Sequence, residues 1–63
     1  MENINTAIGS YKYRLDNRRK DAVMAILNGN YLTAESALGD CIAYEAVIKE
    51  LQYQRQLMEA DNA

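Results

Sequence analysis

The sequence predicts an all-α protein, an antiparallel hairpin of two long helices, and three observations support this prediction. The 63 residues include no proline, and 49% of them are hydrophobic, many being Ala, Leu or Ile. Such a composition favours uninterrupted helices and argues against disorder. Apolar residues recur at spacings of three and four, which is helical periodicity. Only the segment NGNYLT, residues 28 to 33, interrupts this pattern.

The first helix is expected to run from about residue 5 to residue 28. Asn3, Asn5 and Thr6 can each cap its N-terminus, because their side-chain oxygens accept hydrogen bonds from free backbone N–H groups. The sequence leaves the choice between these three residues open. The apolar face of this helix is expected to comprise Ile4, Ile8, Tyr11, Leu15, Ala22, Val23 and Ile26.

The turn is expected at about residues 29 to 33, where Gly29 suits the left-handed conformation that follows many helices. Thr33 can then cap a second helix from about residue 34 to residue 59, with Leu32 as a hydrophobic staple. Because the connection is so short, the two helices must fold back on each other as an antiparallel hairpin.

The second helix carries two apolar stripes, which one partner helix cannot both cover. The stripe expected to pack on the first helix has heptad spacing and comprises Ala37, Cys41, Tyr44, Ile48, Leu51, Arg55 and Met58. The other is the expected self-association surface, and it comprises Gly39, Ile42, Ala43, Ala46, Tyr53 and Leu57. Two hairpins meeting there would form a dimeric four-helix bundle, while an ordinary exposed surface on a monomer is the alternative.

The small size of the chain, a single domain over residues 1 to 63, makes such a partner plausible on energetic grounds. A chain this short has a marginal core and usually needs disulfides, a metal ion or a partner. The one cysteine, Cys41, cannot form an internal disulfide and is expected to be buried between the helices. With no histidine and no second cysteine, we expect no metal site, cofactor or enzymatic activity.

The segment LDNRRKD, residues 15 to 21, raises the question of nucleic-acid binding in a chain of net charge -2. Acidic residues of the second helix are expected to neutralise the first helix through three pairs: Lys20 with Asp40, Arg14 with Glu45 and Lys12 with Glu50. Arg18 and Arg19 then remain free. The expected contacts for a partner protein are Tyr13, Arg18, Arg19 and Met24.

A weak DNA-binding regulator is the alternative, in which a dimer pools Arg14, Arg18, Arg19 and Lys20. The turn region resembles a helix-turn-helix in placing Gly29 between two helices, but Glu35 falls where that motif needs an apolar residue. The isoelectric point of about 4.9 also argues against binding to phosphates. An assembly or scaffolding element is a third alternative.

The stretches MENINTAIGSYKYRLDNRRKDAV and AYEAVIKELQYQRQLMEADNA, and the chain between them, resemble the small open-reading-frame products of the exo–xis region of lambdoid bacteriophages. The resemblance implies an early phage protein that acts in the cytoplasm of the host bacterium and influences the choice between lytic and lysogenic development. No catalytic or binding residues come with this family. The absence of a long apolar run agrees with a cytoplasmic protein that has no membrane partner.

Overall fold

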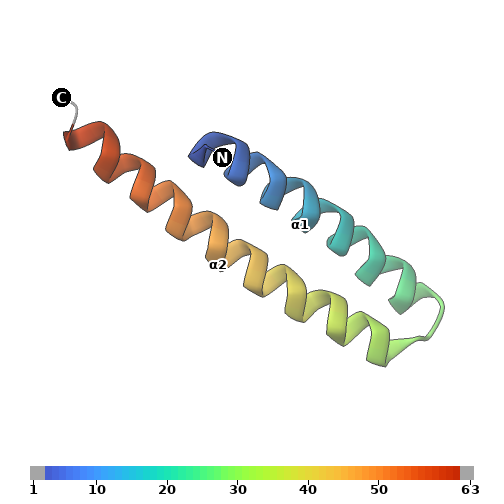
Figure 1. Ribbon diagram of the computed structural model, residues 1–63. Helices are drawn as coiled ribbons and strands as arrows, with labels where there is room; N and C mark the ends of the chain where they lie inside the picture. The colour runs from blue at the N-terminus through green and yellow to red at the C-terminus, as the bar shows by residue number, and fades with distance from the viewer. Residues whose placement is uncertain (1–2, 62–63) are drawn as a thin grey trace.

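The computed structural model describes residues 3 to 61 and confirms the predicted all-α hairpin. Helix α1, Ile4–Leu27, and helix α2, Tyr31–Asp61, run antiparallel and pack against each other (Figure 1). Residues 3 to 61 form no strand. The hairpin is a thin rod with dimensions of 51 × 17 × 15 Å, so most side chains lie near solvent.

Asn3 is the residue that caps α1. Its Oδ1 accepts hydrogen bonds from the backbone N–H of Thr6 at 2.9 Å and from the Thr6 hydroxyl at 3.1 Å. The first of these bonds satisfies one of the N–H groups that have no partner inside a helix. The structure thus selects Asn3 from the three candidate caps and begins the helix at Ile4.

The loop between the helices is shorter than predicted and comprises only Asn28, Gly29 and Asn30. Gly29 has a φ angle of 74°, and the N–H groups of Gly29 and Asn30 donate to the carbonyls of Ile26 and Ala25 at 3.0 and 2.8 Å. These two bonds form the Schellman arrangement that ends many helices at a glycine. The predicted role of Gly29 is therefore confirmed.

Asn30, not Thr33, caps α2, so the predicted start of the second helix was three residues late. The Asn30 Oδ1 accepts from the backbone N–H of Thr33 at 3.4 Å, which places Thr33 inside the first helical turn. Asn30 can cap because it directly follows the left-handed glycine and its side chain reaches the free N–H groups. Leu32 is exposed and forms no staple.

The contact between the helices is a seam in which residues of α1 recur at alternating spacings of four and three. Its α1 side comprises Ile4, Ile8, Tyr11, Leu15, Arg18, Ala22 and Ala25, all of which are buried or half-buried. The sequence correctly predicted five of these residues but placed Val23 and Ile26 in the seam instead of Arg18 and Ala25. Val23 and Ile26 are about half exposed, because they lie one position beyond the heptad register.

The α2 side of the seam follows the predicted series from Ala37 to Arg55 and extends it back to Ala34. Met58, the last predicted member, is 53% exposed. Arg55 bonds to Asn5 near the start of α1, so Met58, about one turn further along α2, lies beyond Ile4, where α1 begins. The C-terminal turns of α2 run past the N-terminal end of α1 in Figure 1.

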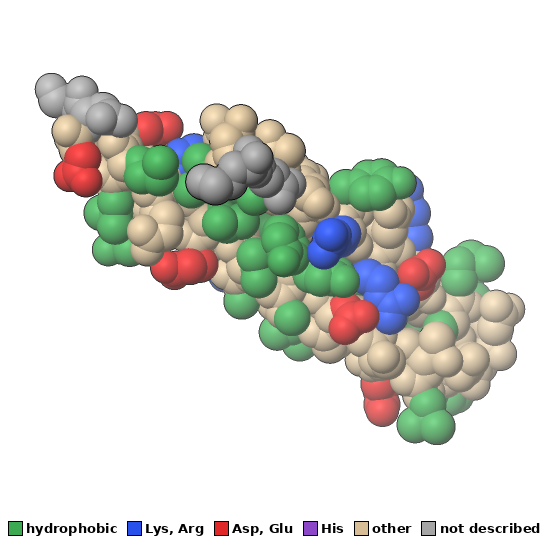
Figure 2. Space-filling view, in the orientation of Figure 1, with side chains coloured by type: hydrophobic (Ala, Val, Ile, Leu, Met, Phe, Trp, Pro, Cys, Tyr) green, Lys and Arg blue, Asp and Glu red, His purple; other side chains and the backbone are tan. Residues whose placement is uncertain are grey.

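The buried interior of the rod is thin and changes character along its length. Leu15, Cys41 and Ile48 form a cluster at the middle, with Tyr11 and Tyr44 packed against it. The rings of these two tyrosines meet edge to face at 5.8 Å between centroids. Toward the loop, the buried side chains are four alanines: Ala22, Ala25, Ala34 and Ala37. Many larger hydrophobic side chains consequently remain at the surface along the rod (Figure 2).

Candidate protein-binding surface

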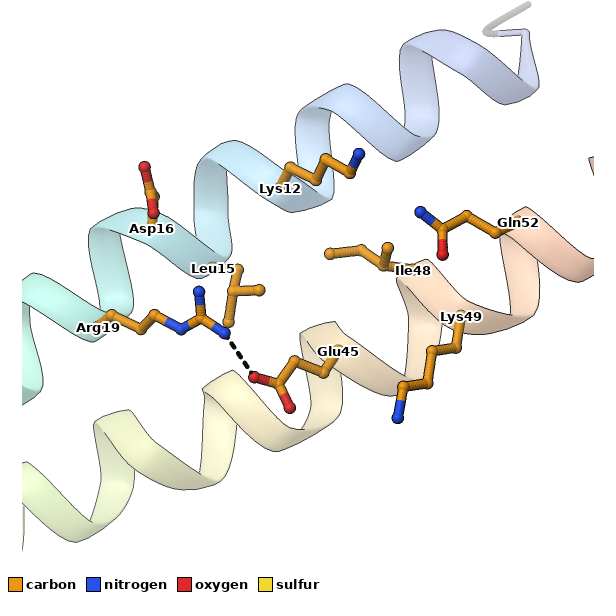
Figure 3. Close-up of a pocket in the computed structure, with 8 residues that line it drawn as sticks. All are labelled: Lys12, Leu15, Asp16, Arg19, Glu45, Ile48, Lys49 and Gln52. Atoms are coloured by element: carbon orange, nitrogen blue, oxygen red, sulfur yellow. Dashed lines mark hydrogen bonds and ion pairs between the residues drawn. The ribbon is translucent and has the colours of Figure 1, made fainter.

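An open groove with a volume of about 440 Å³ lies between the helices near the middle of the rod. Its lining comprises Lys12, Leu15, Asp16 and Arg19 from α1 and Glu45, Ile48, Lys49 and Gln52 from α2 (Figure 3). Leu15 and Ile48 are buried, so they form an apolar floor, and charged side chains form the rims. A groove of this kind suits an apolar side chain of a partner flanked by polar contacts.

One ion pair crosses between the helices at this groove. The Nη2 of Arg19 lies 2.7 Å from the Oε1 of Glu45 (Figure 3). Both side chains remain about half exposed, so solvent screens the pair and its contribution to stability is small. Its structural effect is to hold the guanidinium of Arg19 beside the groove.

A second open hollow, with a volume of about 480 Å³, is lined by Arg19, Lys20, Val23 and Met24. Because Arg19 lines both the hollow and the groove, the two form one continuous surface. We call this surface the cationic track and define it by all the residues that line the groove or the hollow: Lys12, Leu15, Asp16, Arg19, Lys20, Val23, Met24, Glu45, Ile48, Lys49 and Gln52.

The charge of the cationic track is opposite to that of the chain as a whole. The groove and the hollow together carry four cations and two carboxylates, Asp16 and Glu45. The rest of the chain carries three cations and seven carboxylates. Glu45 is neutralised by Arg19, and Asp16 points away from α2 in Figure 3. The track is therefore a locally basic surface with an apolar floor.

The predicted charge pairs were wrong in their residues, although acidic α2 side chains do neutralise α1. Arg18 Nε bonds to Asp40 Oδ2 at 2.9 Å, and Arg18 Nη1 lies 3.1 Å from Asp21 Oδ2. Together with Arg19 and Glu45, these contacts take up the two arginines that were expected to be free. Arg18 falls at a seam position, so its side chain lies within reach of both carboxylates. The hydrogen bond to Asp21, helped by attraction to Asp40, raises the pKa of Arg18 above its ordinary value.

Arg14, which was expected to pair with Glu45, lies over the ring of Tyr11 instead. Its guanidinium carbon is 5.2 Å from the ring centroid, a cation–π arrangement. At the open end of the hairpin, Arg55 Nη1 donates to Asn5 Oδ1 at 3.0 Å. This bond and the bond between Arg18 and Asp40 connect the helices at well-separated points and fit one antiparallel register.

Of the expected partner contacts, Tyr13 and Met24 are 71% and 58% exposed and face outward. They are eleven residues apart, about three helical turns, so they share the side of α1 opposite the seam. Arg19 is half exposed although it is paired. Arg18 lies in the seam and is not an outward contact. The binding role of Tyr13, Arg19 and Met24 stays a prediction.

The six residues of the expected self-association surface are all exposed on α2. They are Gly39, Ile42, Ala43, Ala46, Tyr53 and Leu57. A Cβ atom added at Gly39 would meet nothing within 4 Å, so the hairpin itself gives no reason for a glycine there. This space around Gly39 agrees with a close approach by another chain, which stays a prediction.

Sequence reasoning missed Lys12, Val23 and Lys49 as parts of a candidate surface. Lys12, Arg19 and Val23 are separated by seven and four residues, so they lie on one flank of α1. That spacing is visible in the sequence. The matching flank of α2, however, depends on which stripe of each helix faces the other.

Residues 3 to 61 contain few groups suited to catalysis or metal binding. Cys41 is a free cysteine buried in the seam, as predicted. Within residues 3 to 61, no group of three or more Cys, Asp or Glu side chains is placed to hold a metal ion. No helix over the same residues is long and apolar enough to cross a membrane.

Comparison of the chain with protein-family models, curated proteins and solved structures finds no match. The resemblance to phage exo–xis proteins therefore receives no support from these comparisons.

Proposed function

We propose that this chain is a non-enzymatic protein-binding module whose exposed helix faces dock on another protein. The observation that carries this proposal is the distribution of large apolar side chains. Within residues 3 to 61, twelve large hydrophobic residues are exposed, whereas only eight residues are buried and half of those are alanines. Exposed apolar side chains that lie together, as Val23 does with Met24 in the hollow, commonly mark surfaces that another protein covers.

The resemblance to phage early proteins supports a more specific form of this proposal. In that form, the chain acts in the cytoplasm of the host bacterium and shifts the choice between lytic and lysogenic development by binding a host or phage protein. Small helical hairpins suit such a role because each exposed helix face can pack against a groove or a bundle of the target.

We also propose that the chain is a homodimer whose contact is the α2 stripe from Gly39 to Leu57. The accessible surface of the hairpin is 4844 Å², while a compact monomer of this mass exposes about 4,100 Å². The difference is close to the roughly 800 Å² that each partner buries in a standard interface. Pairing through α2 would bring two small-residue stripes together and produce a four-helix bundle.

DNA binding is the weaker alternative. Two of its four proposed contacts, Arg18 and Arg19, are paired with carboxylates, and breaking those pairs would offset part of the attraction to phosphate. The chain is acidic overall, which also opposes binding to a polyanion.

Co-purification of the tagged protein from infected host lysate, with and without nuclease, tests the proposed function. We expect one host or phage protein to be retained after nuclease treatment and to be lost with a Val23→Asp, Met24→Asp variant. Retention that depends on nucleic acid would support the DNA alternative instead. For the dimer, Ala46→Glu is expected to halve the mass in sedimentation, and an unchanged mass would exclude this stripe.

A further inference from the structure

The cationic track has the length and shape of a seat for one helix. Lys12 and Val23 lie eleven residues apart on one flank of α1, which corresponds to about 16 Å of helix axis. Between them, the groove floor of Leu15 and Ile48 continues along the same flank of α1 to Val23 at the edge of the hollow. Met24, nine residues beyond Leu15, faces the other side of α1. A partner helix of about three turns would cover this distance with apolar side chains at i, i+4, i+7 and i+11.

The rims of the track specify the charge of that helix. Lys12 and Arg19 on α1 and Lys49 on α2 border the groove, and Lys20 borders the hollow. Within residues 3 to 61, Lys12, Lys20 and Lys49 form no ion pair. A partner carboxylate could therefore approach any of these three lysines without breaking an existing contact.

From this geometry we infer that the cationic track binds an acidic amphipathic helix of another protein. The inference names the partner chemistry for the proposed protein-binding function and rests on that function. Complementary charges would orient the helix and speed its approach, while apolar side chains of the partner would leave water by packing on the groove floor and on the exposed Val23. Arg19 would keep its bond to Glu45 and border the partner helix.

A second copy bound through the same track is disfavoured, because it would place lysines against lysines. The proposed dimer stripe lies elsewhere on α2, so a dimer leaves the groove between the helices available. A nucleic acid is also disfavoured, since phosphate contacts gain nothing from an apolar floor made by Leu15, Ile48 and Val23.

The test uses the full chain and three synthetic helical peptides of about 14 residues each. The first has leucines at i, i+4, i+7 and i+11 with flanking glutamates; the second replaces the glutamates with lysines; the third replaces the leucines with glutamines. Fluorescence anisotropy is expected to show binding of the first peptide at least about tenfold tighter than either of the others.

A charge-reversed protein and a matched control locate the binding. Lys12→Glu, Lys49→Glu is expected to weaken binding of the acidic peptide about tenfold and to strengthen binding of the basic peptide. Arg14→Glu is the control, because Arg14 is an exposed cation on the other flank of α1. It should change either affinity by less than about twofold. Helicity measured by circular dichroism confirms that each variant is folded.

Equal binding of the acidic and basic peptides, or an equal effect of the Arg14 variant, would overturn the inference. It would also be overturned if Val23→Glu converted a dimer into a monomer, because a second copy would then occupy the track. Failure of the proposed function is a separate result: no protein is then retained from lysate. A lysate partner retained by a chain that ignores the acidic peptide would leave the function standing and reject only the partner chemistry.

Discussion

Arg18 and Asp40 meet across the seam, with the Arg18 Nε 2.9 Å from the Asp40 Oδ2. Apart from Arg18, the α1 side of the seam consists of apolar and aromatic residues. The guanidinium also reaches Asp21 on its own helix, so one side chain bridges two carboxylates. A polar residue at a heptad position commonly sets the register of paired helices at some cost in stability.

Replacing Arg18 tests this role. Arg18→Leu is expected to leave the thermal midpoint unchanged or higher, because leucine adds apolar burial and both half-exposed carboxylates become hydrated. Arg18→Lys is expected to lower the midpoint by less than about 8 °C, since lysine lacks the planar fork that reaches both carboxylates. Circular dichroism melts check both variants. A larger loss for leucine than for lysine would show that the ion pair stabilises the fold more than packing can.

The pH dependence of this contact follows from the raised pKa of Arg18. A cation whose pKa is higher in the folded state contributes its stability below the unfolded value and loses it only as pH rises through the folded value. Deprotonation of Arg18 therefore plays no part in unfolding near neutral pH. The melting temperatures of the unchanged protein and of Arg18→Leu should accordingly differ by the same amount at neutral and at mildly alkaline pH.

Gly29 is the position where a side chain should be most costly. Its φ angle of 74° is strained for other residues, so Gly29→Ala should lower the free energy of unfolding by about 1–2 kcal/mol. Gly9→Ala is the control, because an added Cβ meets nothing within 4 Å there, and it should raise the same quantity by about 0.5–1 kcal/mol. Urea denaturation measures both. Similar effects of the two substitutions would contradict the left-handed geometry at Gly29.

A substitution at Gly39 distinguishes the proposed dimer from a monomer, because the two predict opposite effects. In an isolated hairpin, Gly39→Ala would stabilise α2 by about 1 kcal/mol, since alanine is the better helix former. We expect instead that Gly39→Ala weakens the dimer, because the added methyl group would occupy space needed by the second chain. Sedimentation equilibrium measures the dissociation constant. Stabilisation equal to that of Gly9→Ala, without any change in association, would contradict the dimer.

The thiol of Cys41 reports on separation of the helices. It is buried in the cluster with Leu15 and Ile48, so a thiol reagent reaches it only when the seam opens. We expect native Cys41 to react at least about tenfold more slowly than the urea-unfolded chain. Kinetics with a chromogenic disulfide reagent check this prediction. Equal rates would mean that the seam is open most of the time.

Local residue chemistry made most of the fold predictable. The glycine of the loop and the heptad series from Ala37 to Arg55 act over one or two helical turns, and each is visible in the sequence. The sequence limited the cap of α1 to three candidates but did not select Asn3. The predicted start of α2 was late because both Asn30 and Thr33 have side chains that can cap a helix. Which of the two caps α2 depends on the backbone geometry after Gly29. The exposure of Met58 depends on where the opposite helix begins.

The candidate surface was less predictable, since it depends on both helices at once. Tyr13 and Met24 could be identified as outward residues from the periodicity of α1 alone. Arg18 and Arg19 were expected to be free because the sequence does not specify which carboxylates of α2 they reach. The groove floor of Leu15 and Ile48, with Lys12 and Lys49 at its rims, exists only when the two helices are in register.

By itself, the sequence determined two helices, the glycine turn between them and the stripe of α2 that packs inward, because these follow from helical periodicity and backbone conformation. Only the tertiary structure decided that Ala25 packs inward while Val23 and Ile26 stay at the surface. The three-residue loop holds the helix ends together there, and small side chains allow close approach of two backbones. The same packing excludes the larger side chains and leaves an apolar, basic surface beside Arg19 exposed.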